Sequence, residues 1–494
     1  MKTIKTFLLI AFSATAVALT SCQSKTGKIT DIPITTQSND AKESVIKGLE
    51  AMDNGDLTMA KSFFTKAIEQ DPKLAIAHIL KGNTNGTPQE FAADMSAAKA
   101  NLEGASNWEK WYYDYFNTFL TSDWNKRVEV CQQIATAYPD AARAQVDLGN
   151  AYSNGNQNEK ARECYQKAIS MNPNWAGGYL SLASSYISWD PKDLKKGEEN
   201  AVKAVGLAPK SCGAEITLGD CYRAEMNLEK AREAYGKAIM LDPSVPDAYF
   251  KKGHANSLLG NYEEARQNYQ DGGKHDETQA SAVMFSSLTY VYDGDLKTAM
   301  NYLSDNSAKM DASGESKDKI AVAKYLYLDN CANICLHSGD AIKLKETISA
   351  MTPLSDEMGN QVGTEEAKLT QKAQMMYWES IASSIEGDYD AAKAKAEELK
   401  STMESIKDPL KLNNYEFALG YMAMKQKNYG DANAHFGKIV QPTVYHKYWM
   451  AMAEEGAGNK EKAKSLYKEI SEFNWTGIAN ALIRKEVKTK MASL

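Results

Sequence analysis

Four prolines in the first half of this 494-residue chain are almost evenly spaced, and the spacing constrains the fold more than any other feature. Pro139, Pro173, Pro209 and Pro243 follow one another at intervals of 34, 36 and 34 residues. Proline lacks an amide donor and disfavours helical geometry at the preceding residue, so each one predicts the end of a helix. A period of this length is typical of stacked helical pairs, so we expect a helical solenoid.

The segments that end at these prolines repeat small and aromatic residues at the same offsets. Two of them carry the same series, Gly149, Tyr152, Ala161, Tyr165, Ala168 and Gly219, Tyr222, Ala231, Tyr235, Ala238. Small residues let two helices approach closely, and the rings fill the space beside that contact. The pattern resembles the tetratricopeptide repeat, a helix pair of about 34 residues. The resemblance implies an all-α, right-handed superhelical solenoid of about nine or ten helix pairs.

The period and its interruptions predict an organisation into segments. A turn inside each pair is predicted where Gly precedes Asn or Asp, as at Gly155, Gly260 and Gly294, because Gly accepts the left-handed conformation that ends a helix. We expect a signal peptide at 1–21, a flexible tether at 22–40, an N-terminal array at 41–303 that is irregular at 83–107, a loop at 304–320, and a divergent C-terminal array at 321–494.

The N-terminus carries the second strong signal. Lys2 and Lys5 precede an apolar stretch that ends at Leu19-Thr20-Ser21-Cys22. This resembles a bacterial lipoprotein signal, which implies that Cys22 receives lipid and becomes the first residue of the mature chain. The alternatives are an ordinary signal peptide and a spanning helix, but the stretch is shorter than the roughly 20 residues that a span needs. We expect a lipid-anchored protein of the bacterial cell envelope, at the outer membrane and facing the periplasm.

Charge and motifs argue against several function classes. The net charge is −7 and both signs are interspersed along the helices, which disfavours nucleic acid as a partner. The chain lacks Gly-rich phosphate loops and the common hydrolase and zinc signatures, so we expect no enzyme activity, no catalytic residue and no cofactor. Cys331 and Cys335 share a helix face near His337, but buried small hydrophobes are the favoured interpretation over a metal site.

The resemblance also implies where partners bind. Repeats of this kind line a concave groove with their first helices, and the groove holds extended peptides or helices of other proteins. Carried over to this chain, the groove positions are Arg143, Asn150, Asn154, Asp220, Arg223, Phe250, Lys251 and His254. The expected function is therefore a membrane-anchored scaffold whose partners are other proteins.

A cluster of aromatic residues supports an alternative function. Its members are Trp108, Trp111, Tyr112, Tyr113, Tyr115, Phe116 and Trp124. Stacked rings hold sugars as readily as they fill a core, so the alternative is an outer-membrane lipoprotein that binds a nutrient, glycan or peptide, together with a transporter. The spacing of the cluster also suits an ordinary buried stripe on a helix.

Overall fold

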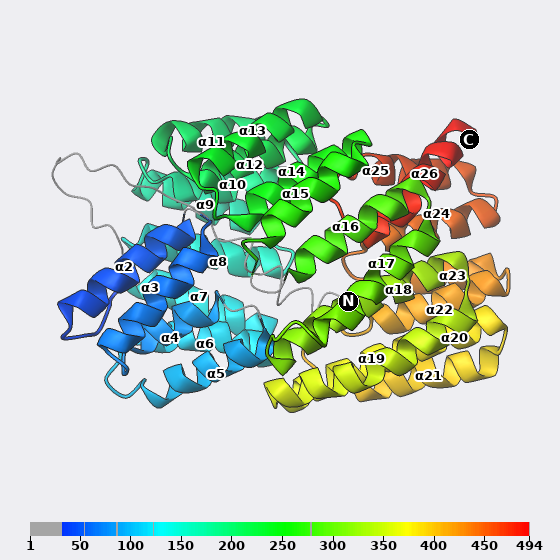
Figure 1. Ribbon diagram of the computed structural model, residues 1–494, viewed down its shortest axis with the longest axis horizontal. Helices are drawn as coiled ribbons and strands as arrows, with labels where there is room; N and C mark the ends of the chain where they lie inside the picture. The colour runs from blue at the N-terminus through cyan, green and yellow to red at the C-terminus, as the bar shows by residue number, and fades with distance from the viewer. Residues whose placement is uncertain (1–31, 54, 85–86, 122, 277–278, 494) are drawn as a thin grey trace. The chain divides into compact units, whose positions relative to one another are not determined.

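The computed structural model describes residues 32–53, 55–84, 87–121, 123–276 and 279–493, and their secondary structure is entirely helical (Figure 1). The chain forms two compact units, an N-terminal unit that ends at Ala255 and a C-terminal unit that begins at Asn256. The boundary falls inside α14 (Pro246–Leu259) and not near residue 304. The prediction of an all-α fold is confirmed.

The N-terminal unit is a stack of six antiparallel helix pairs. Each pair packs its two helices against each other, and the second helix of most pairs also packs against the first helix of the next. The helices are α2 (Asn39–Asp53), α3 (Leu57–Gln70), α4 (Ala75–Gly82), α5 (Pro88–Ala100), α6 (Asn107–Thr121), α7 (Trp124–Ala137), α8 (Ala142–Asn154), α9 (Asn158–Met171), α10 (Ala176–Ser188), α11 (Leu194–Leu207), α12 (Cys212–Ala224) and α13 (Leu228–Leu241).

The C-terminal unit continues the same architecture with longer helices in its middle. Its helices are α15 (Tyr262–Gly273), α16 (Ala280–Asp293), α17 (Leu296–Met310), α18 (Lys317–Ser338), α19 (Ala341–Val362), α20 (Glu365–Glu386), α21 (Tyr389–Thr402), α22 (Asn413–Lys425), α23 (Tyr429–Phe436), α24 (Val444–Gly456), α25 (Lys460–Ser471) and α26 (Ile478–Ser493). Five pairs follow one another from α16 to α25. With the six pairs of the N-terminal unit, the described residues hold slightly more pairs than the expected nine or ten.

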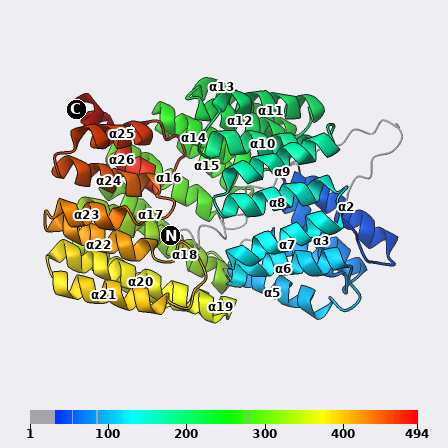
Figure 2. The ribbon, with the colours of Figure 1, turned by 180° about the vertical axis from the view of Figure 1, so that it is seen from behind.

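Helix α26 lies apart from this sequence of pairs. It packs against α25 and α24, its neighbours in the chain, and also against α16 and α18 from the start of the unit (Figure 2). Ile478, Leu482, Ile483 and Val487 form its buried side. The last helix therefore joins the two ends of the C-terminal unit.

A glycine facing an aromatic ring sets the close approach within the pairs. In α8, a Cβ at Gly149 would lie 2.4 Å from Cε1 of Tyr165 in α9, and in α12 a Cβ at Gly219 would lie 2.5 Å from Cε1 of Tyr235 in α13. The same geometry recurs in the C-terminal unit, where Gly420 faces Phe436. Any side chain at these positions would collide with the ring, which explains the repeated small and aromatic columns.

The residues predicted to end helices do so. Pro139, Pro173, Pro209 and Pro243 each stand two residues beyond the last residue of α7, α9, α11 and α13. Gly260 and Gly294 adopt positive φ angles of 87° and 94° at their turns, whereas at the Gly155 turn the left-handed residue is Asn156, with φ of 60°. Asn and Asp tolerate this conformation better than other residues that carry a side chain.

Several connections differ from the expected segments. The part of the tether that the structure describes is docked: Ile32 is buried in the core of the N-terminal unit, and the amide of Thr35 donates to Glu109 Oε1 at 3.3 Å. Residues 83–107 contain one regular helix, α5, which packs against α4 as the second helix of a pair. The connection between α17 and α18 covers only residues 311–316 of the expected loop.

Among the described residues, no helix has the length and apolar character that a membrane span requires.

Candidate functional sites

The predicted groove residues of α8 take part in a buried cluster of charges. The guanidinium of Arg143 donates to Oδ2 of Asp53 at the end of α2, 90 positions earlier in the chain. Asp147, one turn further along α8, is buried on the same side, and both Asp53 and Asp147 retain one carboxylate oxygen without a hydrogen bond. Burial, opposed by Arg143, raises the pKa of Asp53 to about 6 and that of Asp147 to about 7.

Two asparagines of α8 differ in their surroundings. The hydroxyl of Tyr165 in α9 donates to Oδ1 of Asn150 at 2.9 Å, so this side chain joins the two helices of its own pair. Asn154, at the end of α8, is partly exposed. Among the predicted groove residues of this helix, Asn154 is therefore the one that remains open to a partner.

A second buried cluster joins α12, α13 and the start of α14. Oδ1 of Asp220 accepts hydrogen bonds from Arg223 at 2.9 Å and from the hydroxyl of Tyr235 at 2.8 Å, while Oδ2 accepts one from Lys251. Lys251 also lies 3.4 Å from Asp247, one turn earlier in α14. Two carboxylates and two cations are thus enclosed together inside the stack.

The two remaining groove candidates lie in α14, the helix that contributes Lys251 to this cluster. Phe250 is buried, and His254 is partly buried with a pKa that burial, Arg223 and Lys251 lower well below its usual value. The two charge clusters use most of the polar candidates for contacts within the unit. Partner binding by these residues stays a prediction, and a ligand would have to replace the internal contacts of Arg143, Asp220, Arg223 and Lys251.

The remaining candidates from the sequence are cysteines. Cys22 lies outside the described residues. Cys331 and Cys335 are buried free thiols, and burial raises the pKa of each to about 12, so both stay protonated. In the part of the chain that the structure describes, no three His, Cys, Asp or Glu side chains are grouped to hold a metal.

The aromatic cluster packs mainly inside the N-terminal unit. Trp108, Tyr112, Tyr113, Tyr115 and Phe116 are all buried in its core. Trp111 packs partly buried against that core, and the ring of Trp124 lies beside the guanidinium of Arg127 at 5.6 Å. The buried rings fill space between helices, and so they do not form an open stacking platform for a sugar.

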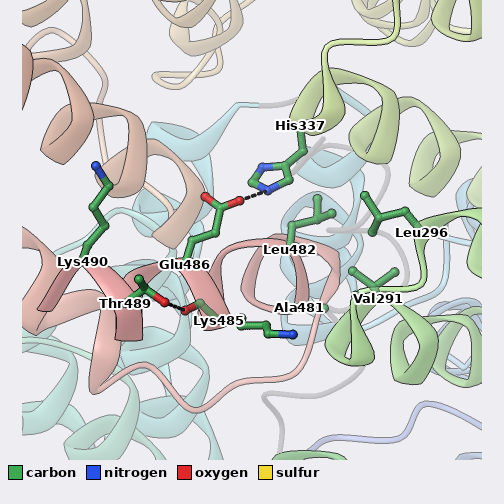
Figure 3. Close-up of a pocket in the computed structure, with 10 residues that line it drawn as sticks. Val291, Leu296, His337, Ala481, Leu482, Lys485, Glu486, Thr489 and Lys490 are labelled. Atoms are coloured by element: carbon green, nitrogen blue, oxygen red, sulfur yellow. Dashed lines mark hydrogen bonds and ion pairs between the residues drawn. The ribbon is translucent and has the colours of Figure 1, made fainter. Parts of the chain in front are cut away.

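An open cavity of about 410 Å³ lies in the C-terminal unit, between α16, α17, α18 and α26 (Figure 3). Val291, Leu296 and Leu482 give it an apolar wall. Its rim consists of Lys485, Glu486, Thr489 and Lys490 of α26, with Gly294 and His337 from the array. The cavity thus combines an apolar floor with a charged rim, a composition typical of binding sites in proteins.

A polar network holds one side of this rim. Nε2 of His337 lies 3.2 Å from Oε1 of Glu486, and the hydroxyl of Tyr448 donates to Oε2 of the same carboxylate. The hydrogen bond with His337, followed by that of Tyr448, lowers the pKa of Glu486, which therefore carries a negative charge at neutral pH. Lys490 is likewise matched, because its ammonium lies 2.9 Å from both carboxylate oxygens of Glu455.

Lys485 differs from the other charges of the rim. Its ammonium reaches across the cavity toward the end of α16, within 3.9 Å of the position that a Cβ of Gly294 would occupy (Figure 3). Among the described residues, no carboxylate forms an ion pair with it. Sequence reasoning missed this site, since its residues come from segments nearly 200 positions apart. The one available signal was the basic run Arg484, Lys485, Lys488 and Lys490 in an acidic protein.

Comparison with known proteins identifies the repeats. Models of the tetratricopeptide repeat match residues 45–74, 142–174 and 219–260. Each match begins in the first helix of a pair, at α2, α8 and α12. The matched residues include Gly48, Gly149 and Gly219, which face aromatic rings across their pairs.

Individual relatives are distant. The chain is 22% identical over 270 residues to mouse Superkiller complex protein 3, covering 46% of this chain and 17% of that protein. It is 25% identical over 212 residues to the mouse mitochondrial import receptor subunit TOM70, covering 41% of this chain and 34% of that protein. The chain thus spans a minor part of these two curated relatives. A tetratricopeptide repeat protein from Parabacteroides merdae shares 13% identity, with a TM-score of 0.33, over 59% of this chain and all of that chain.

The family-model matches and the stacked helix pairs agree on the architecture. Glycine–aromatic contacts, helix-ending prolines and antiparallel pairs are found at the positions that the repeat requires. Such arrays support protein–protein interaction, because each helix pair adds a short segment to one continuous surface. The chain thus contains tetratricopeptide repeats.

Proposed function

We propose that this protein is a scaffold of the bacterial cell envelope, anchored by lipid at Cys22 and facing the periplasm, which binds other proteins or extended peptides through its repeats. The carrying observation is that two units of stacked helix pairs follow a lipoprotein-like N-terminus. Repeat arrays present extended surfaces that suit peptide segments and helices of partners. No catalytic step is part of the proposal.

The nutrient-binding alternative loses its main support. It relied on the aromatic cluster around α6, and five of those rings are buried in the core. The described residues that remain open in the two arrays are mostly polar or charged, as on an ordinary helical surface. The scaffold is therefore the function that the geometry favours.

The anchor is tested by fractionating cells that express the full-length protein or its Cys22→Ala variant. We expect the unchanged protein in the membrane fraction, released only by detergent, and the variant in the soluble periplasmic fraction. Cys164→Ala is the matched control, because it removes a cysteine from α9 without changing the signal. Membrane association of Cys22→Ala equal to that of the control would contradict the lipid anchor.

The scaffold role is tested by crosslinking in living cells, followed by affinity capture and mass spectrometry. We expect a short, reproducible set of envelope proteins that is absent from a mock-tagged strain. Capture of glycans together with a transporter would favour nutrient binding instead, and capture of nothing above background would contradict both functions.

A further inference from the structure

The cavity beside α26 has a charge balance that points to the chemistry of its ligand. Of the basic side chains at its rim, Lys490 is paired with Glu455, and His337 faces the carboxylate of Glu486. Glu486 in turn has its two partners, His337 and Tyr448. Lys485 is thus the rim charge that no carboxylate of the described residues pairs with, and it would attract an anion into the cavity.

The apolar wall lies next to this ammonium. Val291 and Leu482 are 3% and 7% exposed, so they form the buried floor of the cavity. Leu296 is half-buried at the entrance. Lys485 is exposed, and its ammonium extends over the cavity toward the end of α16 (Figure 3). A ligand whose apolar group lies on this floor could therefore place a negatively charged group against Lys485, a few ångströms away.

Volume limits the size of the ligand. About 410 Å³ is near the lower end of the range for small-molecule sites, and it accommodates two or three amino-acid side chains but no folded partner. The cavity is open to solvent, so a ligand bound in it can extend beyond it. An extended peptide meets these conditions.

We propose that the cavity between α16, α18 and α26 binds an extended segment of a partner protein in which an apolar side chain adjoins an acidic one. The apolar side chain lies against Val291 and Leu482, and the carboxylate pairs with Lys485. The proposal rests on the proposed scaffold function and names the kind of segment that this scaffold recognises.

The test is a selection from a random-peptide phage library on the full-length protein, solubilised in detergent. We expect enriched sequences that carry Leu, Ile, Val or Phe beside Asp or Glu. Individual selected peptides, synthesised with a fluorescent label, are then titrated by fluorescence anisotropy against the unchanged protein and three variants. Lys485→Glu reverses the unpaired charge, and Thr489→Trp fills the mouth of the cavity.

Lys488→Glu is the matched control, because it makes the same charge change at an exposed position of α26 that does not line the cavity. We expect the dissociation constant to rise at least tenfold in Lys485→Glu and Thr489→Trp, and at most twofold in Lys488→Glu. Both cavity residues are exposed, and unchanged thermal melting of each variant verifies that it is folded.

Three results would overturn the proposal: enrichment of sequences without the apolar–acidic pair, equal binding by all variants, or no enrichment over the starting library. The failure of the scaffold function is distinguishable. If crosslinking captures the same envelope proteins with Lys485→Glu as with the unchanged chain, the cavity proposal is wrong while the scaffold proposal stands.

Discussion

In the N-terminal unit Asp53 and Asp147 are enclosed between helices, whereas in the C-terminal unit Glu455 and Glu486 lie partly exposed beside lysine or histidine. Burial raises the pKa of Asp53 to about 6 and that of Asp147 to about 7. In the C-terminal unit burial also acts on Glu455, but hydrogen bonds from Lys490 and Tyr467 outweigh it and lower the pKa. The comparison shows that one repeat architecture supports two electrostatic designs.

A raised and a lowered pKa make the stability of the folded protein depend on pH in opposite directions. A carboxyl group whose pKa is raised on folding stabilises the protein while it is protonated, and that contribution is lost as pH rises from the unfolded value of 3.8 through the folded value. A carboxyl group whose pKa is lowered stabilises the protein above its unfolded value of 4.5, and that contribution is lost as pH falls. The stabilities of the two units can be followed separately, since Cys212 and Cys221 are buried in one and Cys331 and Cys335 in the other.

The largest effect is expected from removing the cation between the buried carboxylates. Arg143→Met leaves Asp53 and Asp147 without their counter-charge, so at pH 8 the N-terminal unit should lose about 3 to 5 kcal/mol of unfolding free energy. The measurement is urea unfolding with a brief pulse of thiol labelling, read by mass spectrometry at each cysteine. Arg232→Met, which removes a more exposed cation from α13, serves as the control. A loss no larger than in this control would show that the cluster is not a stabilising contact.

The second-largest effect is expected from pH, which should change the unfolding free energies of the two units by different amounts. From pH 5 to pH 8 we expect the N-terminal unit to lose about 2 to 4 kcal/mol, because Asp53 and Asp147 must ionise while buried. His254 opposes this trend, since its lowered pKa makes folding more favourable as pH rises through the usual histidine range. The shifted carboxyl groups of the C-terminal unit titrate below pH 5 and should contribute less than about 1 kcal/mol in this window.

This pH response is measured by equilibrating the protein in urea at each pH and labelling it in a short pulse at pH 7.5. In Asp147→Asn the slope of the N-terminal unit should become shallower, while that of the C-terminal unit should not change. Parallel slopes for the two units in the unchanged protein would contradict the difference in their electrostatics.

A smaller effect is expected from the glycines that face aromatic rings. Gly219→Ala should cost the N-terminal unit about 1 to 3 kcal/mol, because its Cβ would lie 2.5 Å from Tyr235. Gly420→Ala should do the same to the C-terminal unit alone, through Phe436. Gly236→Ala is the control within the same helix pair, since its Cβ would meet nothing within 4 Å, and it should stabilise α13 by about 0.5 to 1 kcal/mol. Equal effects of Gly219→Ala and Gly236→Ala would show that the close approach is not required.

The smallest effect concerns the attachment of α26. Glu486→Gln removes the charged acceptor that His337 and Tyr448 share, so the C-terminal unit should lose about 0.5 to 1 kcal/mol. Labelling of Cys331 and Cys335 in urea reports this loss, and Lys488→Gln, on the same helix, is the comparison variant. If both variants behave alike, α26 is held by its apolar side alone.

The repeat itself could be predicted from the sequence for a physical reason. The contact between Gly149 and Tyr165 involves residues 16 positions apart in one pair, so local periodicity carries it directly. The same holds for the prolines that follow the second helices and for the turn at Gly294, whose positive φ only glycine adopts easily.

The surroundings of the candidate sites could not be predicted in this way. The pair formed by Asp53 and Arg143 depends on the small rotations between successive pairs, which accumulate until α2 meets α8. The position of α26 against α16 and α18 depends on the same accumulation in the C-terminal unit. The repeat columns specify how neighbours pack, but they contain no information about which distant helices meet.

The docking of residues 32–38 has a mechanical consequence. Ile32 is buried, the amide of Thr35 donates to Glu109, and the hydroxyl of Thr36 donates to Asp71 at 2.6 Å. A pulling force that enters the chain at Ile32 would therefore load these contacts together before it reaches α2. If the chain is held at its N-terminus as proposed, these contacts would have to break before the force reached the helix pairs behind them.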